Sequence, residues 1–235
     1  MQYMGGKSKI SKDIAEILNK YTPGKPFVSL FCGALSVESK VIASQYIMND
    51  SHKYLIALFR AMQDGFEPPE NVSRDEYYYI KEHKDENPAL TGFVGFGCSF
   101  GGRWFEGYAK NKTGTNYAKQ SKNSLMKKFD SLMGATFYND DYKGISIPAG
   151  AIVYADPPYA NTKKFSNKSF GHSEFWDYIS IRSKNNIIFI SELTAPKGFI
   201  SIWERPVKRV LDVNKDNIFA STEKLYVHES NVEKL

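Results

Sequence analysis

The chain has 235 residues, 42% of them hydrophobic and 24% charged, and carries a formal net charge of +5. These values are ordinary for a globular protein with one large α/β domain and a smaller lobe, and the mild basic excess is compatible with an acidic partner. Two distant cysteines, Cys32 and Cys98, argue against a disulfide framework or a zinc site, and the lack of any apolar run near ~18 residues argues against membrane insertion, so we expect a reduced, cytoplasmic protein.

Strand-like and helix-like segments alternate along the chain, which favours an α/β sheet. In chain order we expect a helix at 7–20, strands at 26–31 and 46–50, and helices at 51–65 and 73–83. Ser73 and Glu76 have the spacing of a capping box at the start of the third helix. A glycine-rich aromatic stretch and a basic helix ending near Gly134 follow, and then strands at 135–139, 151–155, 186–191, 206–211 and 224–228.

The positive charge is concentrated in the segment 103–128. This segment holds seven basic residues and one acid, Glu106, so its local excess is larger than that of the entire chain. The basic residues are Arg103, Lys110, Lys112, Lys119, Lys122, Lys127 and Lys128. Such a cluster is either a solvated helix face or a surface for an acidic partner.

The stretch before this segment, residues 92–108, interleaves glycine with aromatic residues. Phe93, Phe96 and Phe100 recur at helical spacing, which is typical of a buried helix face. We therefore interpret the aromatic residues as core packing of a lobe, and residues 66–133 as an insertion on the sheet. The four histidines are scattered and are assigned no chemistry.

Two predicted strands end in residues that suit a ligand, because open parallel sheets bind ligands at the carboxyl ends of their strands. The first runs into a turn at Gly33, where a glycine either lets the backbone approach a ligand or simply serves the turn. The second ends in Asp50, 17 residues after Gly33. A carboxylate at about this spacing commonly accepts hydrogen bonds from ribose hydroxyls, but Asp is also a common helix cap, and both interpretations stay open.

A third predicted strand, residues 151–155, stops at Asp156, Pro157, Pro158 and Tyr159. The two prolines lack N–H donors and fix φ, so the turn is stiff and holds the Asp156 carboxylate and the Pro157 carbonyl in one relation. Two acceptors held together suit the two hydrogens of an –NH2 group, and the tyrosine ring can stack on the flat ring that bears the amine. The alternative is a proline-rich strand exit with Asp as a turn former.

In this order the motifs resemble the Dam-type, D12-class family of adenine-N6 DNA methyltransferases, including its bacteriophage members. The matching motifs are YMGGK at 3–7, FCGAL at 31–35, ND at 49–50 and DPPY at 156–159, followed by HSEFWDYI at 172–179 and IIFISELTAP at 187–196. The resemblance implies a Rossmann-like S-adenosylmethionine-dependent methyltransferase sheet, residues 1–65 and 134–235, with an inserted small helical target-recognition lobe, residues 66–133. It also implies a site-specific enzyme that methylates N6 of an adenine flipped out of double-stranded DNA.

The resemblance assigns a role to each matching residue. Those expected to bind S-adenosylmethionine are Tyr3, Met4, Gly5, Gly6, Lys7, Phe31, Gly33, Asp50, Asp141, Tyr142 and Asp156. Lys7 would lie near the methionine carboxylate, Asp50 would hold the ribose hydroxyls, and NDDYK at 139–143 would meet the cofactor adenine through Asp141 and Tyr142. The catalytic residues would be Asp156, Pro157, Pro158 and Tyr159, with the tyrosine stacked on the target base.

The same resemblance makes DNA the expected partner of the basic segment. We favour phosphate contacts for its seven basic residues, and Arg103 is the best candidate for reading a base because its guanidinium is a bidentate donor. The enzyme is expected to be a monomer and to require no metal.

Two features depart from the family pattern. Ser29 and Leu30 stand where the family usually has an acidic residue and a proline, and Leu35 replaces the second glycine of the turn. Two alternatives therefore stay open: a DNA-binding protein on the same fold with impaired catalysis, and an enzyme that methylates RNA or a protein amide. The aspartate at 156 and the basic insertion favour DNA adenine.

Overall fold

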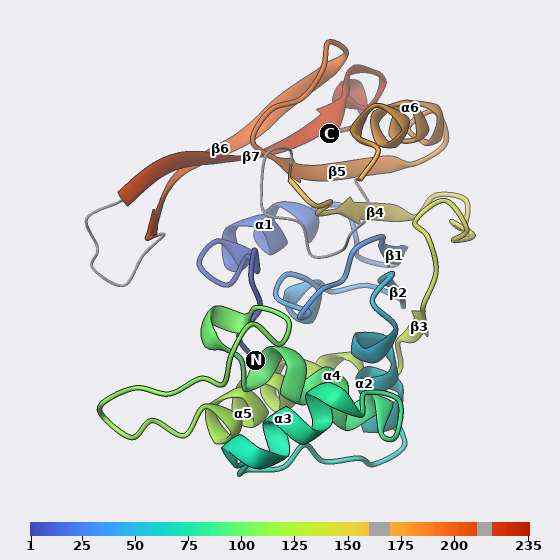
Figure 1. The fold of residues 1–235 in the computed structure, drawn as a ribbon. Helices are drawn as coiled ribbons and strands as arrows, with labels where there is room; N and C mark the ends of the chain where they lie inside the picture. The colour runs from blue at the N-terminus through green and yellow to red at the C-terminus, as the bar shows by residue number, and fades with distance from the viewer. Residues whose placement is uncertain (160–169, 211–217) are drawn as a thin grey trace.

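The computed structural model describes residues 1–159, 170–210 and 218–235. Seven strands form one mixed sheet through the middle of the molecule (Figure 1). They are β1 (Pro26–Ser29), β2 (Gln45–Asn49), β3 (Thr136–Tyr138), β4 (Ile152–Ala155), β5 (Ile187–Glu192), β6 (Phe199–Val210) and β7 (Ile218–His228).

The order of the strands across the sheet is β3-β2-β1-β4-β5-β7-β6. The pairs from β3 to β5 are parallel, whereas β7 runs antiparallel to both β5 and β6. The chain order reverses between β1 and β4, and the crevice at such a reversal is where open α/β sheets bind ligands. The expected Rossmann-like α/β sheet is therefore confirmed.

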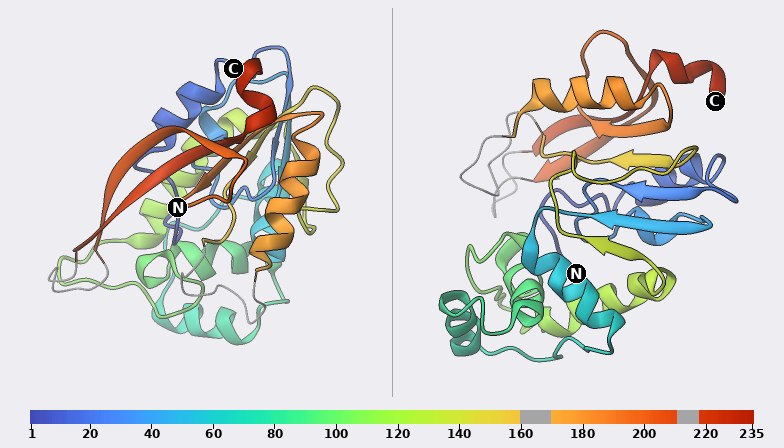
Figure 2. Two further views of the ribbon diagram at one scale, coloured as in Figure 1. Left: turned by 90° about the horizontal axis from the view of Figure 1, so that it is seen from above. Right: turned by 90° about the vertical axis from the view of Figure 1, so that its right-hand side faces the viewer.

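Helices cover both faces of the sheet, as the two views of Figure 2 show. The helices are α1 (Ser11–Leu18), α2 (Lys53–Gln63), α3 (Arg74–Glu82), α4 (Pro88–Gly97), α5 (Tyr117–Phe129) and α6 (His172–Arg182). Short 3-10 turns lie at Glu38–Lys40, Phe100–Gly102, Asp130–Leu132 and Glu229–Lys234. The predicted capping box begins α3: the Ser73 hydroxyl accepts from the Glu76 N–H at 3.1 Å, and the Glu76 carboxylate accepts from the Ser73 N–H at 2.7 Å.

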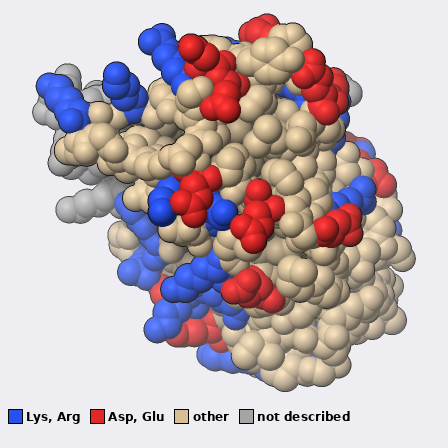
Figure 3. Space-filling view, turned by 90° about the horizontal axis from the view of Figure 1, so that it is seen from below, with Lys and Arg blue, Asp and Glu red and all other residues tan. Residues whose placement is uncertain are grey.

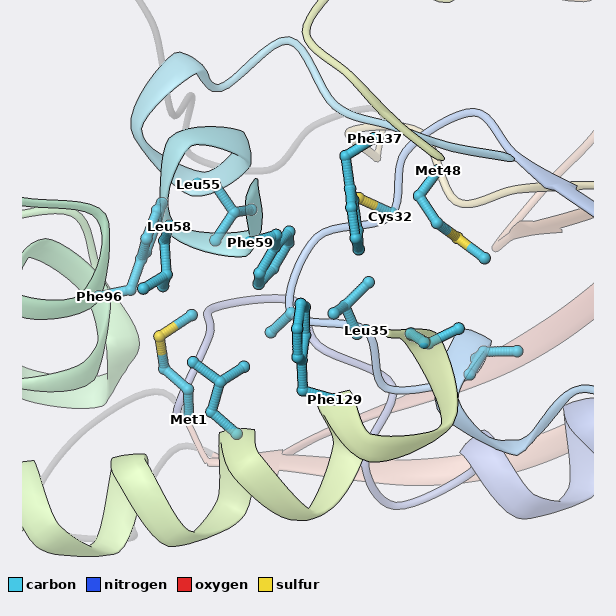
Figure 4. Packing of buried hydrophobic residues seen from close by; sticks show 14 of the residues in the cluster. Met1, Cys32, Leu35, Met48, Leu55, Leu58, Phe59, Phe96, Phe129 and Phe137 are labelled. Atoms are coloured by element: carbon cyan, nitrogen blue, oxygen red, sulfur yellow. The ribbon is translucent and has the colours of Figure 1, made fainter. Parts of the chain in front are cut away.

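One hydrophobic cluster runs from the sheet into the helices below it (Figure 4). It joins Met48 of β2 and Phe59 of α2 to Phe96 of α4 and Phe129 of α5. Helix α2 contacts β3, α4 packs on α2 and α5, and α3 packs on α4, so these helices share the core of the sheet. None of the helices in the described part of the chain has the length and apolar character needed to cross a bilayer.

The expectation for Phe100 is wrong. Phe93 and Phe96 are fully buried, but Phe100 is 53% exposed. Helix α4 ends at Gly97, and the turn that follows includes Gly102 at a φ of +66°, which an α-helix does not allow. The helical spacing therefore stops before Phe100, and the side chain projects from the turn.

The C-terminal strands are longer than the sequence predicts, since β6 begins at Phe199 and β7 at Ile218. Pro206 lies inside β6, where it pairs with Thr222. A proline is tolerated there because β6 is the edge strand and one side of its backbone needs no partner. The resulting hairpin projects on the left of Figure 1.

Candidate active site

The three predicted ligand-binding strand ends meet at one edge of the sheet. Strand β1 pairs with β2 on one side and with β4 on the other. The pairing continues past the end of β1: the Leu30 N–H donates to the Tyr154 carbonyl at 3.0 Å, and the Cys32 N–H donates to the Asn49 carbonyl at 2.8 Å. Gly33, Asp50 and Asp156 therefore follow three adjacent parallel strands.

Asp50 holds the glycine turn. One of its carboxylate oxygens accepts from the Gly33 N–H at 2.9 Å, and the other accepts from the His52 N–H at 2.9 Å. Helix α2 begins after His52 without a side-chain cap, so the interpretation of Asp50 as a helix cap is wrong. Burial raises the pKa of Asp50. Because a carboxylate oxygen can accept more than one hydrogen bond, the group retains the capacity to bind ribose hydroxyls.

The glycine turn contains two residues with positive φ, Gly33 at +45° and Leu35 at +57°. A non-glycine residue in the left-handed region costs roughly 1–2 kcal/mol. The Leu35 side chain is fully buried in the main cluster (Figure 4), and burying a leucine stabilises by roughly 1.5–3 kcal/mol. Burial thus offsets the strain, and the turn adopts a left-handed backbone although leucine replaces glycine.

The N-terminal segment 1–7 connects the turn after α4 to this corner. The Met4 N–H donates to the Gly102 carbonyl at 3.1 Å, and a Cβ on Gly102 would lie only 2.5 Å from the backbone nitrogen of Tyr3. The Tyr3 ring packs on Phe96 at a centroid distance of 4.8 Å, and its edge lies 3.2 Å from the place of a Cβ on Gly33. Tyr3 therefore fills the space that the glycine turn leaves open.

Lys7 lies between two residues of the DPPY motif. Its Nζ is 2.6 Å from the Asp156 Oδ1 and 4.4 Å from the centre of the Tyr159 ring. The lysine is buried, whereas the Asp156 side chain is 19% exposed. A single ammonium group thus contacts both the carboxylate and the aromatic face that the sequence assigns to the target base. The resemblance also places Lys7 near the cofactor carboxylate, and that assignment stays a prediction.

Phe31, Asp141 and Tyr142 are brought together on the other side of the glycine turn. The Phe31 and Tyr142 rings lie 5.4 Å apart, and Tyr142 is buried. Asn49 fixes the loop that carries Asp141 and Tyr142, because it donates to the Asp140 carbonyl and accepts from the Asp140 N–H, each at 3.1 Å. Asp141 is exposed, and its carboxylate accepts from the Lys143 N–H at 2.9 Å.

Glu38, which no sequence motif singled out, is a buried carboxylate beneath the glycine turn. The Ser29 hydroxyl donates to one of its oxygens at 2.9 Å, and the Val37 N–H donates to the other at 3.1 Å. Burial is the main cause that raises the pKa of Glu38 to about 7. A carboxylate from position 38 therefore contacts Ser29, the position where the family usually has an acid. The sequence signal that could have identified Glu38 is an acidic residue within the largely apolar stretch that follows Gly33.

The basic segment is partly neutralised by acids that the fold brings to it. Arg103 pairs with Glu106 at 3.1 Å. Lys119 pairs with Glu70 at 3.0 Å, and Lys122 pairs with Glu67 at 3.1 Å. Lys110, Lys112 and Lys127 are exposed. Figure 3 shows Lys and Arg gathered on the side where the β6–β7 hairpin projects, with Asp and Glu interspersed.

Lys128 does not fit the predicted phosphate contact. Its ammonium points inward and donates to the Ala34 carbonyl at 2.9 Å and to the Ser36 hydroxyl at 3.0 Å. Burial lowers the pKa of Lys128 to about 8. Lys128 therefore stabilises the glycine turn from α5. Its side chain lies on the inner face of the helix, although the residue belongs to a run of basic residues in the sequence.

A family model agrees with the motifs. The model of the family described as D12 class N6 adenine-specific DNA methyltransferase matches residues 3–93 and 102–205. Among solved structures, the rRNA methyltransferase aviRa from Streptomyces viridochromogenes is 12% identical with a TM-score of 0.43, over 97% of this chain and 87% of that one. A tRNA (m1A58) methyltransferase from Aquifex aeolicus is 10% identical with a TM-score of 0.41, over 94% of this chain and 68% of that one.

Proposed function

Because the chain belongs to the D12 class of N6 adenine-specific DNA methyltransferases, which use S-adenosylmethionine, we propose that Asp156 and Tyr159 form the pocket for the target adenine. The main support for this assignment is the position of Lys7, whose ammonium lies 2.6 Å from the Asp156 carboxylate and 4.4 Å from the Tyr159 ring centre. A carboxylate and a ring face that hold a cationic nitrogen also suit an amine that becomes positive during methyl transfer.

The target amine and Lys7 compete for the same carboxylate, so the lysine moves aside when the base enters. The Asp156 carboxylate and the Pro157 carbonyl then accept one amine hydrogen each, which favours a pyramidal nitrogen with its lone pair directed at the methyl donor. The negative charge of Asp156 stabilises the positive charge that develops on the nitrogen. This interaction is stronger in the transition state than in the ground state, which is the condition for catalysis.

The cofactor lies along the neighbouring strand ends in our proposal. When bound, S-adenosylmethionine supplies a methyl group activated by a positively charged sulfur. Asp50 holds the ribose hydroxyls, because its buried carboxylate is positioned by two backbone N–H groups. Asp141 and Tyr142 meet the cofactor adenine, and Phe31, whose ring lies 5.4 Å from that of Tyr142, lines the methionine side.

The lobe of residues 66–133 binds double-stranded DNA in this proposal. Lys110, Lys112, Lys119, Lys122 and Lys127 contact phosphates, and Arg103 contacts a base. The exposed Phe100 ring lies on the turn whose Gly102 carbonyl binds the Met4 N–H, next to the segment that carries Lys7. An apolar side chain at that place can fill the gap left by an extruded base, whose unstacking costs a few kcal/mol.

Methylation of a plasmid tests the proposed function. Plasmid incubated with the wild-type protein and S-adenosylmethionine is expected to gain N6-methyladenine at one recurring sequence, mapped by long-read sequencing. Asp156→Ala is expected to abolish the modification while S-adenosylmethionine still binds in calorimetric titration. Asp177→Ala, which removes an exposed carboxylate on α6, is the matched control and keeps full activity. Substantial turnover by Asp156→Ala would refute the assignment.

A further inference from the structure

The Tyr159 hydroxyl is held by a buried carboxylate from a distant strand. It donates to the Glu223 Oε2 at 2.6 Å, and Glu223 on β7 is only 4% exposed. We propose that Glu223 is a positioning residue for methyl transfer, which fixes the plane of the Tyr159 ring and makes its face more attractive to positive charge. This inference rests on the proposed role of Tyr159 as the surface that stacks on the target adenine.

The fold directs Glu223 toward the DPPY corner. Alternate residues of a strand point to the same face, so Glu223 shares its face with Leu225 and Val227, both fully buried. Strand β7 lies beside β5, which in turn lies beside β4, the strand that leads into DPPY. Arg205, the cross-strand partner of Glu223, forms an ion pair with Asp13 of α1.

The contact has the length of a charge-assisted hydrogen bond, for which O–H···O⁻ distances are about 2.5–2.7 Å. Such a bond restricts rotation of the phenol and therefore keeps the ring in one orientation for stacking. It also shifts electron density from the hydroxyl into the ring, which strengthens the negative face. The Lys7 ammonium 4.4 Å above that face shows that it already attracts a cation. The effect on a base that becomes positive is larger in the transition state than before it.

A double-mutant cycle between the two residues tests the inference. Glu223→Ala is expected to lower kcat about 10–100-fold, the loss typical of a hydrogen bond to a charged group. Glu223→Gln is expected to lose less, because the amide oxygen still accepts from the hydroxyl. In a Tyr159→Phe background, Glu223→Ala is expected to change kcat less than about threefold, because the hydroxyl through which it acts is gone.

A second measurement separates positioning from general stability. 2-Aminopurine is placed at the target position of a duplex, where its fluorescence rises when the base leaves the DNA stack. Wild-type protein is expected to give this rise. Glu223→Ala is expected to alter the signal, and Glu223→Gln is expected largely to keep it. The matched control is Glu204→Ala, which removes the partner of Lys224 on the same hairpin and is expected to keep wild-type kcat. Melting temperatures of all variants are measured in parallel.

Three results have distinct meanings. Wild-type kcat and fluorescence in folded Glu223→Gln and Glu223→Ala would overturn the inference. An undiminished effect of Glu223→Ala in the Tyr159→Phe background would also overturn it, because Glu223 would then act without the hydroxyl. Failure of the wild-type protein to methylate adenine would instead overturn the proposed function, and the inference with it.

Discussion

Glu38→Gln tests whether the carboxylate beneath the glycine turn is as strongly desolvated as its surroundings indicate. The pKa of Glu38 is about 7, against an ordinary value of 4.5, mainly because of burial. Between these two pH values the folded protein keeps a proton that the unfolded chain releases. The free energy of unfolding of the wild type therefore falls as pH rises through this window, by about 3 kcal/mol from this group.

Glutamine cannot titrate, so the variant lacks this fall. It also loses part of the hydrogen bonding with the Ser29 hydroxyl and the Val37 N–H, but that cost does not depend on pH. The difference in unfolding free energy, wild type minus variant, is therefore expected to decrease by about 3 kcal/mol between pH 4.5 and pH 8. Subtracting the variant removes the contribution of other groups that titrate in this range.

Urea unfolding followed by circular dichroism at four or more pH values measures this difference. Glu16→Gln, which changes an exposed acid on α1, is the matched control and should run parallel to the wild type. Parallel curves for the wild type and Glu38→Gln, within about 0.5 kcal/mol, would refute the reasoning, because the carboxylate would then be ionised in the fold at little cost.

Three further predictions concern cofactor and DNA. Asp50→Asn is expected to weaken S-adenosylmethionine binding about 10–100-fold in calorimetric titration, because an anionic acceptor becomes neutral. Phe100→Ala is expected to change stability by less than about 0.5 kcal/mol but to weaken the 2-aminopurine signal, whereas Phe96→Ala costs about 3–5 kcal/mol in urea unfolding. Lys127→Ala is expected to reduce the salt dependence of DNA binding by about one phosphate contact, whereas Lys128→Ala leaves that slope unchanged and lowers the melting temperature. An equal change of slope for both lysines would contradict the inward orientation of Lys128.

Local sequence patterns were enough to predict much of the fold and of the DPPY corner. The strand at 151–155 was predictable because a continuous apolar run bounded by prolines has few alternatives, and the structure places β4 at Ile152–Ala155. The meeting of Gly33, Asp50 and Asp156 was predictable because parallel strands end at the same edge of a sheet. The capping box at Ser73 was predictable because both of its hydrogen bonds lie within four residues.

Most strands and helices along the chain, the family motifs and the residues at the strand ends could therefore be predicted from local sequence, since each depends on neighbours in the chain. Four features depend on the packing of the whole fold: the inward turn of Lys128, the exposure of Phe100, and the contacts of Glu38 with Ser29 and of Glu223 with Tyr159. Glu223 and Tyr159, for example, are 64 residues apart in the chain. The position of a side chain in such a contact depends on how helices and strands pack against each other. A local pattern of residue types does not specify that packing.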